Sequence, residues 1–216
     1  AMPQIFKDKG YETMFFCGSD HGSMGFGAYA RAVGIDNLYS RQTYEKSRGK
    51  GDFDGYWGIW DEKFLNYMGE VLSEQKQPFF STMFTLTSHH PFVVPQEYEG
   101  KYPKGKTPNH QCVGYVDDAF RKFFAKHEND EWFRNSIFVF VADHVSSEKM
   151  TEVFRRSPGD YHIFGFMYAP DSALFGEHRQ VVSQIDIMPT LLGLMGNSEP
   201  YFAFGRDVFG EFGQTP

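Results

Sequence analysis

The sequence has little cysteine, no excess of basic residues and no long apolar run, and each absence narrows the class of protein. Cys17 and Cys112 are far apart and outside any CxxC spacing, which argues against a disulfide framework and a cysteine-rich zinc site. The formal net charge is −7 without a cluster of Lys and Arg, which argues against nucleic acid as a partner. No stretch approaches the roughly 20 apolar residues of a spanning helix, and the first residues lack a signal-peptide pattern. We expect this chain by itself to be soluble.

Aromatic residues are abundant. Hydrophobic residues make up 41% of the 216 positions and aromatic residues 18%, which is ample for a folded core. No linker or internal repeat divides the chain, so we predict a single α/β domain over residues 1–216. Because residues 3–9 read as the end of a helix without a lead-in, we expect a piece of a larger domain.

Apolar periodicity predicts strands that alternate with helices, which is typical of an α/β protein with a mostly parallel sheet flanked by helices. The predicted strands are 11–17, 37–41, 79–87, 136–142 and 161–169. The predicted helices are 3–9, 28–34, 61–75, 110–127 and 183–196. Residues 47–55 are predicted to form an exposed loop, and residues 95–108 a surface excursion. The helix over 110–127 is expected to turn these residues inward: Val113, Val116, Phe120, Phe123 and Phe124.

Polar clusters follow several of these strands, where loops of a parallel sheet converge and ligands bind. Five of the eight histidines lie in such places: His21, His89, His90, His144 and His162. The other three, His110, His127 and His178, fall on predicted surface elements. A carboxylate beside an imidazole suits a divalent ion, so Asp143 and His144 are candidate metal ligands. Alternatively, Asp143 caps a turn and His144 is a surface residue.

Several motifs occur in an order that resembles the C-terminal part of the sulfatase and alkaline-phosphatase superfamily. They are "GYETMFF", "TLTSHHPF", "VADHVSSE", "DYHIFGFMYAP", "SQIDIMPTLLGLMG" and "FGRDVFG". The similarity is greatest to the lipoteichoic-acid-synthase-like branch of phosphoglycerol and phosphoethanolamine transferases. These enzymes are anchored by upstream helices at the extracytoplasmic face of the bacterial membrane and act on phospholipid head groups.

The resemblance implies roles for particular residues. Asp143 and His144 would bind Mn²⁺ or Zn²⁺. The family's "TxxNHxPF" loop matches "TLTSHHPF", which places the substrate-contacting histidine at His89, and "HIF" places a second catalytic histidine at His162. Asp20 would lie on the substrate side, and Trp57 of "YWGIWDEKF" would border the pocket. Asp20 with His21 reads equally well as a loop cap beside an exposed histidine.

The departures from the family pattern are equally specific. The catalytic Thr or Ser and a further carboxylate ligand lie upstream of the matched region in the family, so we expect this chain alone to be inactive. Val145 replaces a usual Gly or Cys, and Phe164 replaces the Pro of "HIP", which alters the metal side of the site.

Two alternatives remain open. One is a non-catalytic binding or scaffold domain with a degraded site. The other is a hydrolase with Ser23 as nucleophile and His144 or His162 as base, although His21 occupies the first glycine position of a GxSxG elbow. Phosphoglycerol, phosphoethanolamine and sulfate esters are not distinguished by the residues.

Overall fold

The computed structural model describes residues 1–148, 151–170, 174–177 and 179–210. Its main sheet is parallel with strand order β2-β1-β3, formed by β1 (Glu12–Cys17), β2 (Asn37–Tyr39) and β3 (Phe79–Phe84). Met14 of β1 pairs with both Asn37 and Ser81, which sets the register of the three strands. A second sheet contains β4 (Phe138–Val141) and β5 (Gly165–Tyr168), which run antiparallel. The predicted α/β class is confirmed.

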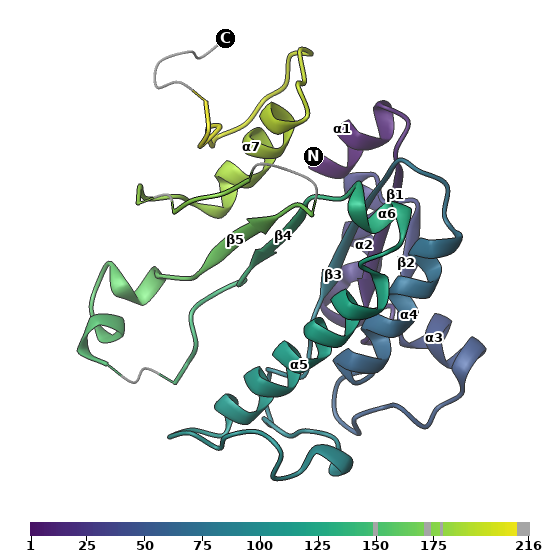
Figure 1. Ribbon diagram of the computed structural model, residues 1–216, viewed down its shortest axis with the longest axis vertical. Coiled ribbons are helices and arrows are strands. Elements are labelled where there is room, and N and C mark those ends of the chain that lie inside the picture. The colour runs from purple at the N-terminus through teal and green to yellow at the C-terminus, as the bar shows by residue number, and fades with distance from the viewer. Residues whose placement is uncertain (149–150, 171–173, 178, 211–216) are drawn as a thin grey trace.

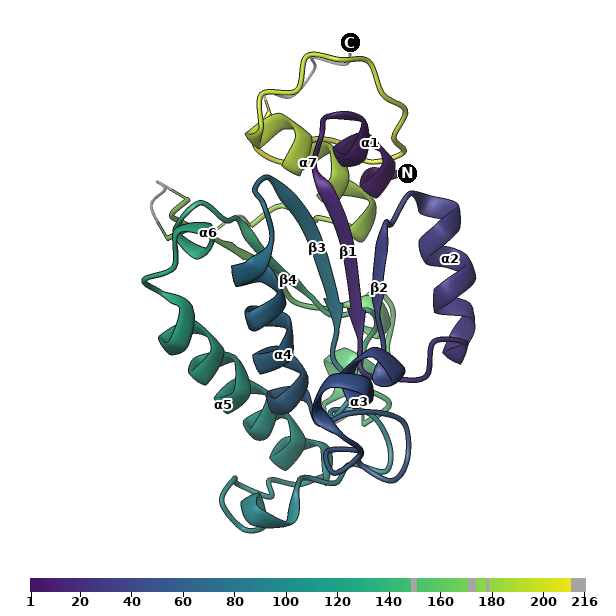
Figure 2. The ribbon, with the colours of Figure 1, turned by 90° about the vertical axis from the view of Figure 1, so that its right-hand side faces the viewer.

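Helices cover the main sheet on both faces, as Figure 1 and Figure 2 show. The longer ones are α4 (Asp61–Glu74) and α5 (Asn109–His127), which lie together on one face. The shorter ones are α1 (Met2–Asp8), α2 (Phe26–Val33), α3 (Arg41–Arg48), α6 (Glu131–Arg134) and α7 (Ile187–Leu194). α2 covers the opposite face beside β1 and β2 (Figure 2). No helix in the described part of the chain is long and apolar enough to cross a membrane.

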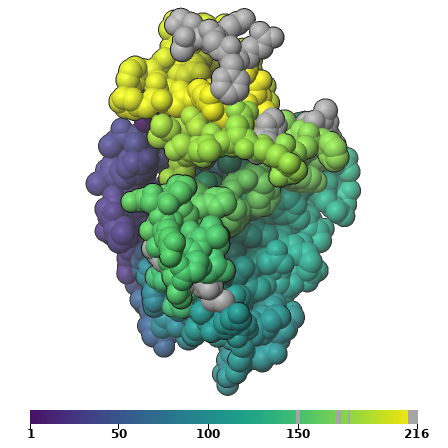
Figure 3. Space-filling view, turned by 90° about the vertical axis from the view of Figure 1, so that its left-hand side faces the viewer, coloured from purple at the N-terminus to yellow at the C-terminus, as the bar shows by residue number. Residues whose placement is uncertain are grey.

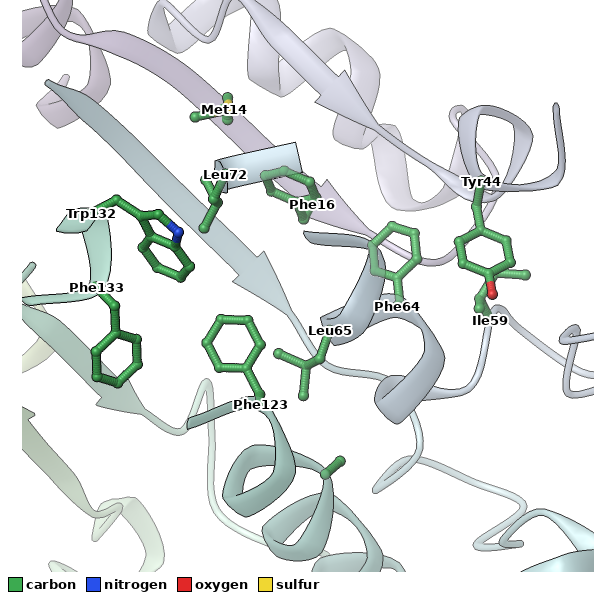
Figure 4. Packing of buried hydrophobic residues seen from close by; sticks show 11 residues of the cluster. Met14, Phe16, Tyr44, Ile59, Phe64, Leu65, Leu72, Phe123, Trp132 and Phe133 are labelled. Atoms are coloured by element: carbon green, nitrogen blue, oxygen red, sulfur yellow. The ribbon is translucent and has the colours of Figure 1, made fainter. Parts of the chain in front are cut away.

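β1 is buried on both faces because its apolar side chains alternate between two clusters. Met14 and Phe16 point toward α4 and α5, whereas Phe15 and Cys17 pack toward α2. Figure 4 shows the larger cluster, in which strand and helix side chains interleave. Its labelled members include Phe64, Leu65 and Leu72 of α4, Phe123 of α5, and Trp132 and Phe133 of α6. Each such side chain contributes roughly 1.5–3 kcal/mol when fully buried.

The helix α5 also contacts the second sheet. The ring centroids of Phe120 and Phe140 lie 5.1 Å apart, and those of Phe124 and Phe138 lie 5.0 Å apart. Thus one helix packs against both sheets, although no strand of one pairs with a strand of the other in the described residues.

Several details of the predicted elements are wrong. His127, predicted on a surface element, is only 4% exposed, because its ring packs 5.0 Å from Phe123 and 5.3 Å from Trp132 at the end of α5. Val113 is 54% exposed, because α5 turns Cys112, Tyr115 and Ala119 inward, and Val113 lies about 100° around the helix from Cys112. α3 was not predicted at all, since Tyr44 is the only buried residue in its charged sequence. Its start is set instead by a capping box, in which Ser40 N–H donates to Thr43 Oγ1 over 2.7 Å.

Candidate functional site

Three loops meet where β1 and β3 end. Ser19, after β1, forms an isolated bridge with Gly58, and the Ile59 N–H donates to the Gly18 carbonyl over 3.0 Å. A Cβ added at Gly58 would lie 2.6 Å from the Gly18 oxygen, so this approach requires glycine at position 58. The Trp57 ring consequently sits beside the ends of both strands.

Trp57 joins the two predicted substrate loops. Its indole centroid lies 4.6 Å from the His89 imidazole, and its Nε1–H donates to Ser23 Oγ over 3.0 Å. The structure therefore brings Trp57 and His89 together, as expected if both border one pocket. Among the described residues, no histidine bonds to the Ser23 hydroxyl, so the arrangement of a serine hydrolase has no support at this position.

His89 is exposed and its ring is held at one nitrogen. Its Nδ1 lies 3.2 Å from the His90 carbonyl oxygen and can donate to it, which leaves Nε2 available for a ligand. His90 packs its ring 4.1 Å from that of Phe92. Of the two adjacent histidines, His89 is the one that contacts Trp57.

Asp61 anchors this loop and was not among the predicted site residues. It is fully buried at the first position of α4, and its carboxylate accepts the N–H groups of Leu86 and Thr87, each over 2.8 Å. Burial raises the pKa of Asp61 to about 6, although both bonds act in the opposite direction. An acid directly before an apolar helical face, in "IWDEKF", was the sequence signal for this anchor.

The first Asp-His pair, Asp20 and His21, forms hydrogen bonds with other residues of the chain. The Asp20 carboxylate accepts from Arg41 Nη2 over 2.7 Å and also from the Gln42 side chain. The His21 N–H donates to Gln42 Oε1 over 3.0 Å, and its ring packs on Gly27. Asp20 thus lies at the same strand end as Trp57, but its charge is balanced by Arg41.

The second pair, Asp143 and His144, follows β4 and is open to solvent. Their side chains are 59% and 73% exposed, and Asp143 Oδ2 lies 3.5 Å from His144 Nε2. His144 Nδ1 lies 2.7 Å from the Val145 carbonyl, so a proton on Nδ1 leaves the Nε2 lone pair free for a cation. Gln184 holds the backbone of this segment, because its Nε2 donates to the carbonyls of Ala142 and Asp143.

The ligand types of Asp143 and His144 fit a divalent metal, but two ligands alone do not make a complete metal site. A carboxylate oxygen and an imidazole nitrogen are ligands that Mn²⁺ and Zn²⁺ accept, and structural or catalytic sites use three or four protein ligands. Within the described ranges, no group of three His, Cys, Asp or Glu side chains is arranged to hold a metal ion.

His162 lies apart from these groups. It ends the short turn Gly159–Tyr161, is exposed, and its ring centroid lies 6.0 Å from that of Phe154. Figure 3 shows the surrounding segment as the green lobe that projects from the surface. β5 begins only at Gly165, so His162 precedes the strand in which it was predicted. No described contact joins His162 to Asp143, His144 or His89; His178 lies outside the described residues.

Comparison with known proteins gives a consistent result. The family model described as Sulfatase matches residues 1–197. Lipoteichoic acid synthase 1 of Bacillus subtilis is 26% identical over 97% of this chain and 35% of its own length. The crystal structure of the lipoteichoic acid synthase LtaP from Listeria monocytogenes superposes with a TM-score of 0.80 at 26% identity, over 96% of this chain and 55% of that one.

A protein of the alkaline phosphatase superfamily from Vibrio parahaemolyticus gives a TM-score of 0.79 at 26% identity, over 97% of this chain and 50% of that one. The chain therefore spans about a third of the length of the curated relative and about half of each solved chain.

Proposed function

Because this chain belongs to the sulfatase family, we propose that it supplies one part of the active site of a metal-dependent enzyme that transfers phosphoglycerol or a related phosphate-ester head group. The observation that supports the proposal is the Asp143–His144 pair, in which Asp143 Oδ2 lies 3.5 Å from His144 Nε2 while His144 Nδ1 faces the Val145 carbonyl. The similarity to lipoteichoic acid synthases favours phosphoglycerol over sulfate as the transferred group.

Asp143 and His144 would hold Mn²⁺ or Zn²⁺ through a carboxylate oxygen and Nε2. When bound, the ion supplies positive charge that stabilises the oxygens of the phosphate ester. Gln184 keeps the two ligands oriented by holding the backbone carbonyls at positions 142 and 143. The nucleophilic Thr or Ser and the remaining ligand would come from an upstream segment, as the family resemblance implies.

His89 and Trp57 would form the substrate side of the site. In its protonated form, His89 carries a proton on Nε2 that it can donate to a phosphoryl or leaving oxygen, while Nδ1 stays bonded within the loop. Trp57 supplies an apolar wall 4.6 Å from that ring and restricts its rotation. His162 is proposed as a second histidine near the phosphoryl group, and Asp20 as a group that positions Arg41 beside the substrate.

We place the enzyme at the extracytoplasmic face of a bacterial membrane, anchored by upstream helices, in keeping with the resemblance.

The decisive experiment is calorimetric titration of Mn²⁺ and Zn²⁺ into the full-length gene product and into this chain. We expect tight binding by the full-length protein, loss of binding in Asp143→Ala, and no change in Asp20→Ala, the matched variant of the other Asp-His pair. Release of glycerol phosphate from a phosphatidylglycerol analogue should be lost in Asp143→Ala together with metal binding, whereas Asp20→Ala should lower it without loss of metal binding, because Asp20 acts on Arg41 and not on the ion. Metal binding that survives Asp143→Ala would refute the assignment, and no binding by either protein would favour a non-catalytic scaffold domain.

A further inference from the structure

The loop before α4 presents Trp57 through a tip that one oxygen atom holds closed. Asp54 Oδ1 accepts three successive backbone N–H groups, which belong to Tyr56, Trp57 and Gly58 and lie at 2.7, 2.8 and 3.1 Å. In return, the Asp54 N–H donates to the Gly58 carbonyl over 2.8 Å. A side-chain oxygen that accepts several N–H groups of a turn fixes the backbone of that turn. The backbone at Trp57 is therefore held by a residue three positions before it.

The same tip is fixed to the end of β1. Gly58 forms an isolated bridge with Ser19, and Phe53 forms another with Ile59, which holds the two arms of the loop antiparallel. Ile59 is 1% exposed and belongs to the larger core cluster. Because both arms are anchored, the freedom that remains to Trp57 is the rotation of its side chain.

Ser23 restricts that rotation from a different loop. Its hydroxyl oxygen accepts the Trp57 Nε1–H over 3.0 Å. The indole is half-buried, and an indole N–H in such a position ordinarily has a hydrogen-bond partner. The ring also packs edge-on against Phe84, the last residue of β3, with 6.1 Å between the centroids. Backbone and side chain of Trp57 are thus held by separate bonds, and both act on the same indole.

The contact between Trp57 and His89 links these bonds to the candidate site. The two ring centroids lie 4.6 Å apart. A proton donor raises a reaction rate only when its acidic nitrogen lies within hydrogen-bond reach of the leaving oxygen, and a small displacement costs much of the effect. Since His89 is exposed, the indole beside it limits the positions that the imidazole can occupy.

We propose that Asp54 and Ser23 are positioning residues, which hold the Trp57 indole against His89 and affect head-group transfer through that indole. The inference rests on the proposed function, because it takes His89 as the proton donor. It gives Ser23, a candidate nucleophile from the sequence, the role of a hydrogen-bond acceptor. One oxygen of Asp54 accepts all three N–H groups, so the amide oxygen of an asparagine can take its place and the negative charge is not required.

Double-mutant cycles in the full-length gene product test the proposal. We expect Asp54→Ala and Ser23→Ala each to lower kcat for glycerol phosphate release about tenfold, with less than about threefold change in KM. Asp54→Asn should stay within about threefold of the wild type, since it keeps the accepting oxygen. In a Trp57→Ala background, both alanine substitutions should change kcat less than about twofold, because the residue through which they act is gone.

Asp52→Ala is the matched control. Asp52 lies in the same loop, but its carboxylate accepts from Tyr44 Oη of α3 and not from the tip. We expect this variant to change kcat less than about twofold even where it lowers the melting temperature. Should Asp54→Ala not fold, Ser23→Ala carries the same test from the other loop.

A second measurement reports on the indole itself and needs no activity. In full-length protein labelled with 5-fluorotryptophan, the fluorine resonance of Trp57 is the one that Trp57→Phe removes. We expect Asp54→Ala and Ser23→Ala to shift or broaden this resonance, because the ring then samples several positions. Asp54→Asn and Asp52→Ala should leave it unchanged.

An unchanged Trp57 resonance in both alanine variants would overturn the proposal. A loss of kcat that persists in the Trp57→Ala background would overturn it too, because Asp54 or Ser23 would then act on the reaction directly. Equal losses in Asp54→Asn and Asp54→Ala would show that the charge of Asp54, and not its bonds to the tip, carries the effect. A shifted resonance in a protein that transfers no head group would refute the proposed function and leave the positioning of Trp57 standing.

Discussion

At the scale of single residues, Asp61 holds the backbone of the loop that carries His89. We predict that Asp61→Asn destabilises the protein by about 1–3 kcal/mol at neutral pH, because an amide accepts only one of the two N–H groups of Leu86 and Thr87 and opposes the other with its own N–H₂. Urea denaturation measures the loss. Unchanged stability would show that the bonds to residues 86 and 87 do not hold the loop.

The pH dependence of that variant has a defined sign. The pKa of Asp61 is raised to about 6 in the folded protein, so the folded state binds its proton more tightly than the unfolded state. The contribution of Asp61 to stability is therefore greatest below about pH 4, falls as the pH rises to about 6, and is constant above that. We expect the stability difference between the wild type and Asp61→Asn to shrink across this range, measured by urea denaturation at several pH values.

His89 and His90 offer a matched pair for activity. In the full-length protein, we predict that His89→Gln lowers the rate of head-group transfer about 100-fold or more, because it removes the imidazole that lies 4.6 Å from Trp57 and is proposed to donate a proton to the leaving oxygen. His90→Gln should change the rate less than threefold, since its ring packs on Phe92. Initial rates of glycerol phosphate release measure both. Equal losses would mean that the loop as a whole, and not His89, carries the effect.

At the scale of elements, Asp118 clamps the 95–108 excursion to α5. Its carboxylate accepts from Lys101 Nζ over 2.9 Å, from Tyr102 Oη over 2.7 Å and from Arg121. Burial raises the pKa of Asp118, but the bonds from these three partners outweigh burial and hold the pKa well below its ordinary range. The clamp therefore operates through an ionised carboxylate at neutral pH.

We predict that Asp118→Asn accelerates proteolysis within residues 95–108 several-fold at pH 7, whereas Asp117→Asn, at an exposed neighbouring position, does not. Because the folded pKa is depressed, the stability from Asp118 is present above about pH 4 and is lost as the pH falls further, opposite to Asp61. Limited proteolysis with mass spectrometry locates the cleavage. Similar rates for both variants would exclude the clamp.

The sequence predicted best those elements whose own apolar pattern shows which side chains are buried. β1 contains the apolar run of residues 14–17, and α4 repeats apolar residues at helical spacing, so both were predicted within about two residues. The sequence did not predict α3, because the start of this helix depends on the Ser40–Thr43 cap and not on an apolar face. Val113 was misplaced because its orientation depends on which side of α5 meets α4, which is decided by tertiary packing.

At the scale of the whole molecule, local pattern indicates which residues follow strands but not which strands become neighbours. The contact between Trp57 and His89 requires the loop before α4 to cross the ends of both β1 and β3, and no local signal encodes that path. Asp143 and His144 were predicted as a pair because they are adjacent in sequence. Their position relative to His89 depends on how α5 joins the two sheets, which tertiary packing decides.

The connection between the two sheets depends on Phe124, which gives the last prediction. Its ring lies 5.0 Å from Phe133, 5.0 Å from Phe138 and 5.6 Å from Tyr168, measured between centroids. Phe124→Ala should cost about 3 kcal/mol, and Val113→Ala, at an exposed position of the same helix, less than about 0.5 kcal/mol.

The loss of stability in Phe124→Ala should be greater in the second sheet than in the main sheet. Phe124 holds β4 and β5 against α5, whereas the core around Phe16 and Phe64 has its own contacts. We expect amide exchange in β4 to accelerate more than exchange in β1 in Phe124→Ala. Hydrogen exchange read by mass spectrometry resolves the two strands. An equal acceleration in both would show that the sheets unfold as one unit and that Phe124 contributes only to global stability.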